Sequence, residues 1–371
     1  MDYHHLENDP QYKGLKVNAG VESRESVNDD AVQRFLSKGR SLKSAEYYIN
    51  GINDGNVTIL SQAVTLVESN NKEHRDIAQK IIEACLQHSG NSVRIGITGV
   101  PGAGKSTFIE AFGMYLTSIG KKVAVLAIDP SSQQTKGSIL GDKTRMEQLS
   151  VNPDAYIRPS PSAGSLGGVA RKTRETIFLC EAAGYDVIII ETVGVGQSET
   201  AVHSMTDFFL LLMISGAGDE LQGIKRGIME MSDGMLINKA DGDNVMKANQ
   251  AKVQYANALH LFPMGKSQWS PMVETCSALK GLNIDKAYEM VESYVEQTHK
   301  NGYFEERRRE QTLYWMYETI EQQLRERFFN NESVKGVIDD YKQKVLNNEI
   351  SSFVAANQLI DRQNTEANLK E

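Results

Sequence analysis

The glycine-rich segment 99-GVPGAGKST-107 constrains the fold of this chain more than any other stretch. It fits the pattern G-x-x-x-x-G-K-[ST], follows the apolar β-type run 93–98 and precedes the helix-compatible stretch 107–120. A strand, a glycine loop and a helix in this order form a phosphate site, because backbone N–H groups and the positive end of the helix dipole surround the anion. A glycine turn without a ligand is the alternative, and these flanks disfavour it.

Two side chains of this loop have specific expected roles. Lys105 is expected to reach the β- and γ-phosphates of a nucleoside triphosphate, and the Ser106 hydroxyl is expected to ligate Mg²⁺. The residues expected to surround the phosphates are Gly99, Val100, Pro101, Gly102, Ala103, Gly104, Lys105, Ser106 and Thr107.

Apolar runs after residue 90 predict an α/β fold with a mostly parallel sheet. They are separated by helix-length segments, which is typical of a sheet covered on both faces. The runs are 93–98, 123–128, 187–191, 208–215, 235–238 and 272–276. Ligands of such sheets bind at the carboxyl ends of the strands. The sequence places the glycine loop, Asp129, Glu191 and Asn238 at these ends.

Amphipathic helical patterns flank the α/β region on both sides. We expect a tail and helical segment over 1–90, a nucleotide-binding domain over 91–288 and a helical dimerisation extension over 289–371. Within the extension, 304–329 carries a narrow apolar stripe between charged residues, which is typical of a helix that pairs with a partner helix. The stripe consists of Leu313, Tyr317, Ile320, Leu324 and Phe328. A homodimer is expected, packing of this helix on its own domain is the alternative, and the cluster 305-EERRRE-310 is expected to be a solvated face.

Composition excludes several other classes of protein. A net charge of −8 and a pI near 5.5 offer no dominant basic face, so no nucleic-acid partner is expected. Three cysteines without a CxxC pair indicate a reducing compartment. The N-terminus lacks the features of a secretory or organelle-targeting signal, and the apolar run 208–215 is too short to span a bilayer. We therefore expect a cytoplasmic protein with no membrane partner.

The tetrad 238-NKAD-241 indicates which base is bound. Asp241 can accept hydrogen bonds from both guanine N1–H and the 2-amino group, whereas adenine offers no such donor pair. A site built to hydrogen-bond its ligand rejects an analogue without the partner by about 10⁴ or more. Asn238 can tie this loop to the phosphate loop, and Lys239 can lie along the base. The residues expected to place a backbone donor at guanine O6 are Ser277, Ala278 and Leu279. GTP or GDP is the expected ligand.

Three carboxylates are candidates for the region around Mg²⁺. Glu191 and Gly194 are spaced as in D-x-x-G with glutamate replacing aspartate, so Glu191 is expected to hold the metal and Gly194 to contact the γ-phosphate. Asp129 and Asp142 lie in the segment that should form the first switch. Mg²⁺ takes few protein ligands, so not all three can be direct ligands. Asp142 is alternatively a loop-capping residue.

The residue after Gly194 predicts slow hydrolysis. Fast-regulated small GTPases carry there a glutamine that orients the attacking water, whereas this chain has Val195, with Gln197 two residues later. Turnover near 10⁻⁴ to 10⁻² s⁻¹ is roughly what unassisted GTPases show. Val100 stands where partition-type ATPases carry an extra lysine, which argues against that class.

Several longer strings together resemble one family. GVPGAGKST, AIDPSS, GDKTRM, ETVGVGQSE, GAGDELQGIKRGIME and NKAD occur in this order. They resemble the MeaB, ArgK and MMAA group of metallochaperone-type GTPases, from about residue 40 to the C-terminus. The resemblance implies a homodimeric GTPase that assists adenosylcobalamin-dependent methylmalonyl-CoA mutase, by gating cofactor loading and by protecting or reactivating the enzyme.

The resemblance also implies a role for 216-GAGDELQGIKRG-227, as a mobile loop that couples nucleotide state to the mutase. Gln222 and Lys225 are expected to contact the partner protein or the second switch, and Gln197 is expected to be a switch residue. An ordinary strand-to-helix loop is the alternative for 216–227. The glycine-rich 162–175 is also family-like, but its chemistry indicates no role. Two rival functions are a chaperone of another cobalamin-dependent acyl-CoA mutase and a metal-insertion GTPase for a nickel enzyme. A kinase is a third, but the chain has neither H-R-D nor D-F-G.

Overall fold

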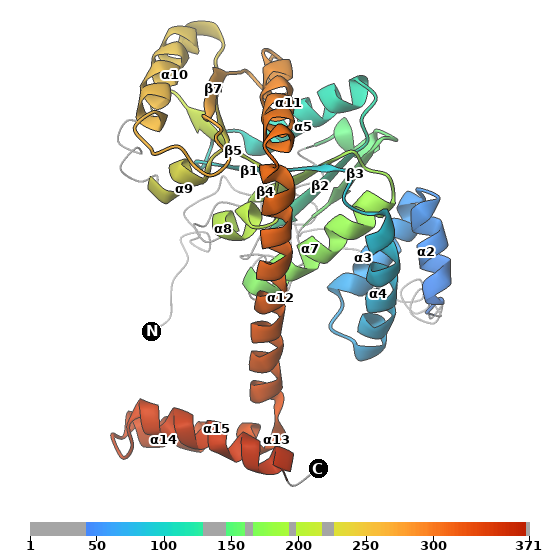
Figure 1. Cartoon of the computed structure of the whole chain (residues 1–371), viewed down its shortest axis with the longest axis vertical. Helices are drawn as coiled ribbons and strands as arrows, with labels where there is room; N and C mark the ends of the chain where they lie inside the picture. Colours follow the sequence, from blue (N-terminus) through green and yellow to red (C-terminus); the bar gives the residue numbers. More distant parts are fainter. Residues whose placement is uncertain (1–41, 129–145, 160–165, 193–197, 217–225, 369–371) are drawn as a thin grey trace, which may run out of the picture. The chain divides into compact units, whose positions relative to one another are not determined.

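A seven-stranded parallel sheet with the order β3-β2-β4-β1-β5-β6-β7 lies at the centre of the computed structural model (Figure 1). Each strand pairs in parallel with its neighbours. The strands are β1 (Val93–Gly99), β2 (Val123–Ile128), β3 (Ala155–Arg158), β4 (Val187–Thr192), β5 (Phe208–Ile214), β6 (Gly234–Asn238) and β7 (Met272–Thr275). The predicted α/β fold is confirmed.

The structure describes residues 42–128, 146–159, 166–192, 198–216 and 226–368. Helices within these ranges are α2 (Ala45–Asn53), α3 (Val57–Glu68), α4 (Lys72–Cys85), α5 (Lys105–Ser118), α7 (Leu166–Ala182), α8 (Ser198–His203), α9 (Arg226–Met231), α10 (Val245–Leu259), α11 (Ile284–Lys300), α12 (Tyr303–Asn330), α13 (Glu332–Lys335), α14 (Ile338–Leu346) and α15 (Ser352–Asn368). Short 3₁₀ turns lie at Leu86–His88, Leu149–Val151 and Gly242–Asn244. Among the described helices, none has the length and apolar character needed to cross a bilayer.

One strand is absent from the sequence-based prediction. β3 is the edge strand of the sheet and has only four residues, of which Tyr156 alone is buried. An edge strand of this length needs no continuous apolar run, so it left no signal in the hydrophobic pattern. The six predicted runs all form strands, with small differences at their ends.

Alternate residues of the strands point to opposite faces of the sheet, as the two-residue repeat of a strand requires. One face packs against α5 and α11, and its core includes Ile97, Val125, Ile189, Leu210 and Phe112. The other face packs against α3, α4 and α7, and its core includes Leu126, Ile190, Phe209, Ile81 and Trp315. The predicted N-terminal helices therefore share a core with the sheet. Residues on both sides of position 288 in α11 lie in the same core cluster, whereas the predicted domain boundaries stay a prediction.

Asparagine side chains determine where two N-terminal helices begin. Asn56 accepts hydrogen bonds from Thr58 and Ile59 N–H at 3.0 and 3.1 Å, and Asn71 accepts one from Glu73 N–H at 2.8 Å. These bonds satisfy N–H groups that have no acceptor within the helix.

Candidate nucleotide site

The glycine loop turns from β1 into α5 at the carboxyl edge of the sheet. A Cβ at Gly104, whose φ is +85°, would lie 2.9 Å from Nδ2 of Asn238. A Cβ at Gly99 would lie 2.3 Å from the carbonyl oxygen of Leu212. Both positions therefore require glycine. Gly104 needs it for its left-handed backbone and for space, and Gly99 needs it for the close approach of β5.

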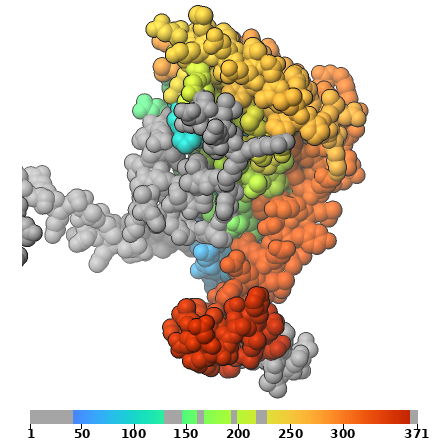
Figure 2. All heavy atoms as spheres, turned by 90° about the vertical axis from the view of Figure 1, so that its left-hand side faces the viewer, coloured from blue at the N-terminus to red at the C-terminus, as the bar shows by residue number. Residues whose placement is uncertain are grey.

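The loop is accessible from outside. Figure 2 shows cyan atoms, which the colour bar places near residue 100, at the surface below the gold atoms of the α10 region. Pro101 and Gly102 are exposed and Ser106 is half-buried. Phe108 N–H donates to the Gly104 carbonyl at 2.9 Å, and the N–H groups that precede it in the first turn of α5 have no acceptor within the helix. Such groups can bind an anion.

The Lys105 amino group lies among loop and carboxylate groups. Its Nζ donates a hydrogen bond to the Gly99 carbonyl at 3.0 Å. Burial lowers the pKa of Lys105, and the negative charges of Glu191 and Glu199 oppose this effect. Glu199 is 6% exposed and belongs to α8. The sequence-based reasoning gave Glu199 no role, although it closes the family-like string ETVGVGQSE.

Asn238 joins three segments at the end of β6. Its Nδ2 donates to the Ala103 carbonyl at 2.8 Å, and its Oδ1 accepts from Ala278 N–H at 3.0 Å. The Cys276 thiol lies 3.6 Å from the same oxygen. The structure thus brings together the phosphate loop, the NKAD tetrad and the segment 277–279, which are far apart in the sequence.

Neighbouring residues of the tetrad also face this junction. The Ser277 hydroxyl donates to Oδ2 of Asp241 and holds that carboxylate in one orientation. Lys239 has a left-handed φ of 60°, and its Cε would lie 4.0 Å from a Cβ at Gly104. Leu279 is exposed, whereas Ser277 is buried. The aliphatic chain of Lys239 therefore passes beside the phosphate loop.

Glu191 is buried near the end of β4 and lies opposite Ile97 in the ladder with β1. The next residue, Thr192, donates its hydroxyl to the Thr98 hydroxyl at 2.9 Å. This buried bond links the strand before the phosphate loop to the strand that carries Glu191. The sequence-based reasoning missed this pair; two threonines closing neighbouring apolar runs were the available signal.

Several predicted site residues lie outside the described residues: Asp129, Asp142, Gly194, Val195, Gln197, Gln222 and Lys225. Within the described ranges, no group of three His, Cys, Asp or Glu residues could hold a metal ion. Because Asp129 and Asp142 lie outside the described residues, Ser106 and Glu191 are the two predicted metal ligands that the structure places. Both offer oxygen donors, which suit Mg²⁺.

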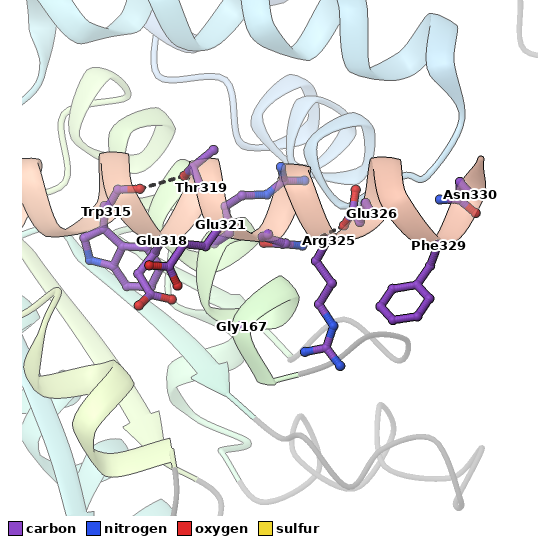
Figure 3. A pocket seen from close by; sticks show the side chains of 11 residues that line it. Gly167, Trp315, Glu318, Thr319, Glu321, Arg325, Glu326, Phe329 and Asn330 are labelled. Carbon is purple, nitrogen blue, oxygen red and sulfur yellow. Dashed lines mark hydrogen bonds between the residues drawn. The ribbon is translucent and has the colours of Figure 1, made fainter. Parts of the chain in front are cut away.

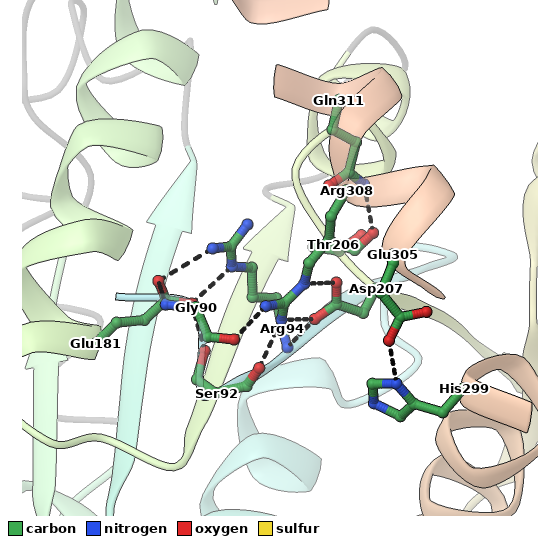
Figure 4. Close-up of polar contacts among 10 residues, drawn as sticks. All are labelled: Gly90, Ser92, Arg94, Glu181, Thr206, Asp207, His299, Glu305, Arg308 and Gln311. Carbon is green, nitrogen blue, oxygen red and sulfur yellow. Dashed lines mark hydrogen bonds and ion pairs between the residues drawn. The ribbon is translucent and has the colours of Figure 1, made fainter. Parts of the chain in front are cut away.

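The amino edge of the sheet carries a second polar cluster (Figure 4). Arg308 of α12 donates to Asp207 at 2.7 and 2.8 Å and to the carbonyls of Gly90 and Ser92. Arg94 donates to Glu181 at 2.8 and 3.0 Å. Burial alone would raise the pKa of Asp207, but hydrogen bonding to Arg308 and the charge of Arg94 hold it below its ordinary value.

Arg307 extends this cluster and corrects a prediction. It is 7% exposed and donates to Asp233 at 3.4 Å, Tyr294 at 2.9 Å and His203 at 3.1 Å. Part of the charged run 305–310 is therefore buried rather than a solvated face. Burial and the charge of Arg307 lower the pKa of His203 to about 3, so this imidazole is neutral and accepts through Nε2.

A groove of about 700 Å³ separates α7 from the second half of α12. Figure 3 shows side chains of α12 along one side and Gly167 of α7 opposite them. Its lining mixes Arg171 and Arg325 with Glu318, Glu321 and Glu326. None of its lining residues belongs to the phosphate loop or the NKAD tetrad, so it is not part of the nucleotide site.

The chain is similar in sequence to several known proteins. A probable GTPase of Mycobacterium tuberculosis (strain H37Rv) is 46% identical over 310 residues, covering 84% of this chain and 92% of that protein. The GTPase ArgK of Escherichia coli is 45% identical over 311 residues, covering 84% and 94%. The mouse mitochondrial methylmalonic aciduria type A homolog is 41% identical over 356 residues, covering 93% and 84%.

A solved structure, the crystal structure of a LAO/AO transport system kinase, has a TM-score of 0.68 and 38% sequence identity, covering 86% of this chain and 99% of that one. The family model described as methylmalonyl Co-A mutase-associated GTPase MeaB matches residues 60–333. The matched region includes the phosphate loop, the tetrad and the first part of α12. This chain is a GTPase, and it belongs to the MeaB family of methylmalonyl-CoA mutase-associated GTPases.

Proposed function

We propose that this GTPase assists adenosylcobalamin-dependent methylmalonyl-CoA mutase, by gating cofactor loading and by protecting or reactivating the enzyme. The family match over residues 60–333 carries the proposal, because the family is described by its association with that mutase. The relative named for methylmalonic aciduria adds support. In this proposal, slow hydrolysis of GTP to GDP determines how long the GTP-bound state lasts, and the mutase responds to that state.

In this proposal the junction at Asn238 selects guanine. Asp241, oriented by Ser277, accepts from the two guanine donors. The N–H groups of Ser277 and Ala278 already donate to Leu282 and Asn238, so the segment 277–279 offers O6 the N–H of Leu279. Lys239 covers the base, and the bond from Asn238 to Ala103 fixes the distance between base and phosphate sites. When the nucleotide binds, the Lys105 amino group would donate to the β- and γ-phosphates in place of the Gly99 carbonyl.

Mg²⁺ fits the oxygen donors at the start of α5 and the end of β4. Ser106 would ligate it directly, and Glu191 would hold it directly or through water, with Asp129 and Asp142 as further candidates from outside the described residues. When bound, the ion neutralises charge that develops on the phosphate oxygens. The charges of Glu191 and Glu199 also oppose the effect of burial on the pKa of Lys105, which favours the cation that would bind phosphate.

GTP hydrolysis measured with and without methylmalonyl-CoA mutase tests the function. Slow turnover is expected for the isolated chain and faster turnover with the mutase present, because Val195 replaces the water-orienting glutamine and a partner must order the site. An isobutyryl-type cobalamin mutase serves as the matched control. Stimulation by the control alone would transfer the proposal to that enzyme, and no stimulation by either would contradict it.

We also propose a homodimer through α12. Leu313, Tyr317, Ile320 and Leu324 are each 46% to 61% exposed, and such a stripe is typical of a seam between helices. A Tyr317→Glu and Leu324→Glu double variant should therefore be a monomer by light scattering, with an unchanged far-UV spectrum. Glu310→Gln, on the same helix, is the control. A double variant that remains a dimer would contradict the role of this stripe.

A further inference from the structure

Three side chains of α12 bind the last residue of α8 and the turn that follows it. They lie four residues apart, on one face of the helix, and each is at most 8% exposed. The contacts are Arg307 Nη2 to His203 Nε2 at 3.1 Å, Gln311 Nε2 to the Thr206 carbonyl at 2.8 Å and Trp315 Nε1 to the Ser204 carbonyl at 3.1 Å. Figure 4 shows the bond between Gln311 and Thr206.

Two of these acceptors are backbone carbonyls just beyond the end of a helix. Backbone carbonyls that are shielded from water need a hydrogen-bond donor from the protein. Here Gln311 and Trp315 supply that donor. The end of α8 is therefore held by a helix that begins almost a hundred residues later, at Tyr303.

α8 and the turn after it lie directly on the strand that leads into the phosphate loop. A Cβ at Gly96 of β1 would lie 2.8 Å from Cγ1 of Val202 and 3.1 Å from Oγ1 of Thr206. Gly96 thus allows an approach that any other residue would prevent. Because buried groups in this contact have no spare room, a shift of α8 displaces β1 or loses packing against it.

The other end of α8 lies near the phosphate-binding lysine. Glu199, in its first turn, is buried and contributes with Glu191 to the electrostatic environment of Lys105. α8 also packs against β4, the strand that carries Glu191. One short helix therefore contacts α12 at its end, packs against β1 and β4, and carries Glu199 in its first turn.

We propose that Gln311 and Trp315 of α12 are positioning residues for GTP hydrolysis, which hold α8 against β1 and so make turnover depend on the placement of α12. The inference rests on the proposed phosphate site at Lys105. The same contacts connect α8 to Trp315, so exchange of the bound nucleotide should also change the surroundings of Trp315. A protein that binds the exposed part of α12 would then alter hydrolysis without touching the nucleotide.

Substitutions that remove the hydrogen-bond donor and leave most of the side chain in place test this role. Gln311→Met and Trp315→Phe each remove one N–H donor, and each should change kcat for GTP by roughly 3- to 30-fold, the range typical of coupling through packed elements. KM should change by less than about two-fold, because these residues do not contact the ligand.

Rates are normalised to the fraction of protein that binds a fluorescent GDP analogue, which removes effects of partial unfolding. Glu310→Gln, at the exposed Lys266 pair on α12, should leave both constants unchanged. Wild-type kcat in both Gln311→Met and Trp315→Phe would overturn the proposal.

Tryptophan emission gives a second readout that a purely structural role would not change. The chain has two tryptophans, Trp269 and Trp315. Exchange of GDP for a non-hydrolysable GTP analogue should shift the emission of the Trp269→Phe variant and not that of Trp315→Phe. Identical emission of Trp269→Phe in both nucleotide states would overturn the inference. Turnover retained by Lys105→Ala would instead refute the phosphate site on which the inference rests.

Discussion

The two edges of the central sheet use their charged residues in opposite ways. At the amino edge, Asp207 accepts two hydrogen bonds from Arg308 and one from Arg94 N–H, and Asp233 accepts from Phe209 N–H and Arg307. At the carboxyl edge, the Nζ of Lys105 donates to a backbone carbonyl, and Asn238 and Asp241 bond to neighbouring loops.

This difference separates stability from binding. The ion pairs of the amino edge are closed by residues of the protein itself, so losing one member leaves a buried charge without its partner. The groups of the carboxyl edge are held in place by backbone carbonyls and by the Ser277 hydroxyl, while the first turn of α5 remains accessible. Substitution at the amino edge should therefore cost folding free energy, and substitution at the carboxyl edge should cost ligand binding and catalysis.

The largest effect is expected for Asp207→Asn. Asp207 is 1% exposed, and its loss leaves Arg308 without its anionic partner in a buried site. The free energy of unfolding by urea should fall by about 3–5 kcal/mol. Glu310→Gln breaks the exposed pair with Lys266 on the same helix and should cost less than about 1 kcal/mol. Equal losses in the two variants would contradict the distinction between the edges.

Lys105→Ala should have the largest effect at the carboxyl edge. Removing a positioned cation from the developing phosphate charge should lower kcat/KM for GTP at least about 100-fold. The urea midpoint should stay close to that of the wild type, because among the described residues the Nζ donates to a single carbonyl, that of Gly99, and the side chain is only partly buried. Steady-state phosphate release measures the rate. Unimpaired hydrolysis would show that the phosphates bind elsewhere.

Asp241→Asn should weaken GTP binding and favour xanthosine nucleotides. Xanthine carries a carbonyl where guanine carries its 2-amino group, so an amide donor matches it better than a carboxylate does. Losing hydrogen bonds to a charged acceptor costs about 1.5–3 kcal/mol, or roughly 10- to 150-fold in affinity. Titration with fluorescent guanosine and xanthosine diphosphates measures both affinities. Unchanged GTP binding would remove Asp241 from the base site.

The smallest effect concerns pH. Burial, with the charge of Arg307, lowers the pKa of His203 from its ordinary value of 6.5 to about 3. The unfolded chain therefore binds a proton below pH 6.5 that the folded chain does not. The contribution of His203 to the free energy of unfolding is complete above that pH and is lost as the pH falls toward 3. Between pH 7 and 5 the loss should be about 1–2 kcal/mol. His203→Gln keeps an acceptor for Arg307 without this titration, and an identical pH dependence would contradict the assignment.

The sequence by itself determined the chemistry of the nucleotide site. The spacing of Gly104 and Lys105 and the order of the NKAD tetrad are local patterns, and each stands at the end of an apolar run. The carboxyl ends of parallel strands lie at one edge, so these patterns predict a shared site without any long-range contact. The family resemblance, now confirmed, followed from the same strings.

Only the tertiary structure decided which charges are buried. Arg307 and Arg308 stand in a charged run that predicts a solvated face, yet α12 places them against Asp233 and Asp207 from distant turns. The edge strand β3, the hydroxyl pair of Thr98 and Thr192 and the electrostatic effect of Glu199 on Lys105 likewise depend on neighbours far along the chain. Hydrophobic periodicity reports the face that an element buries, but the partner of a buried polar group is fixed by packing between elements, which no local pattern encodes.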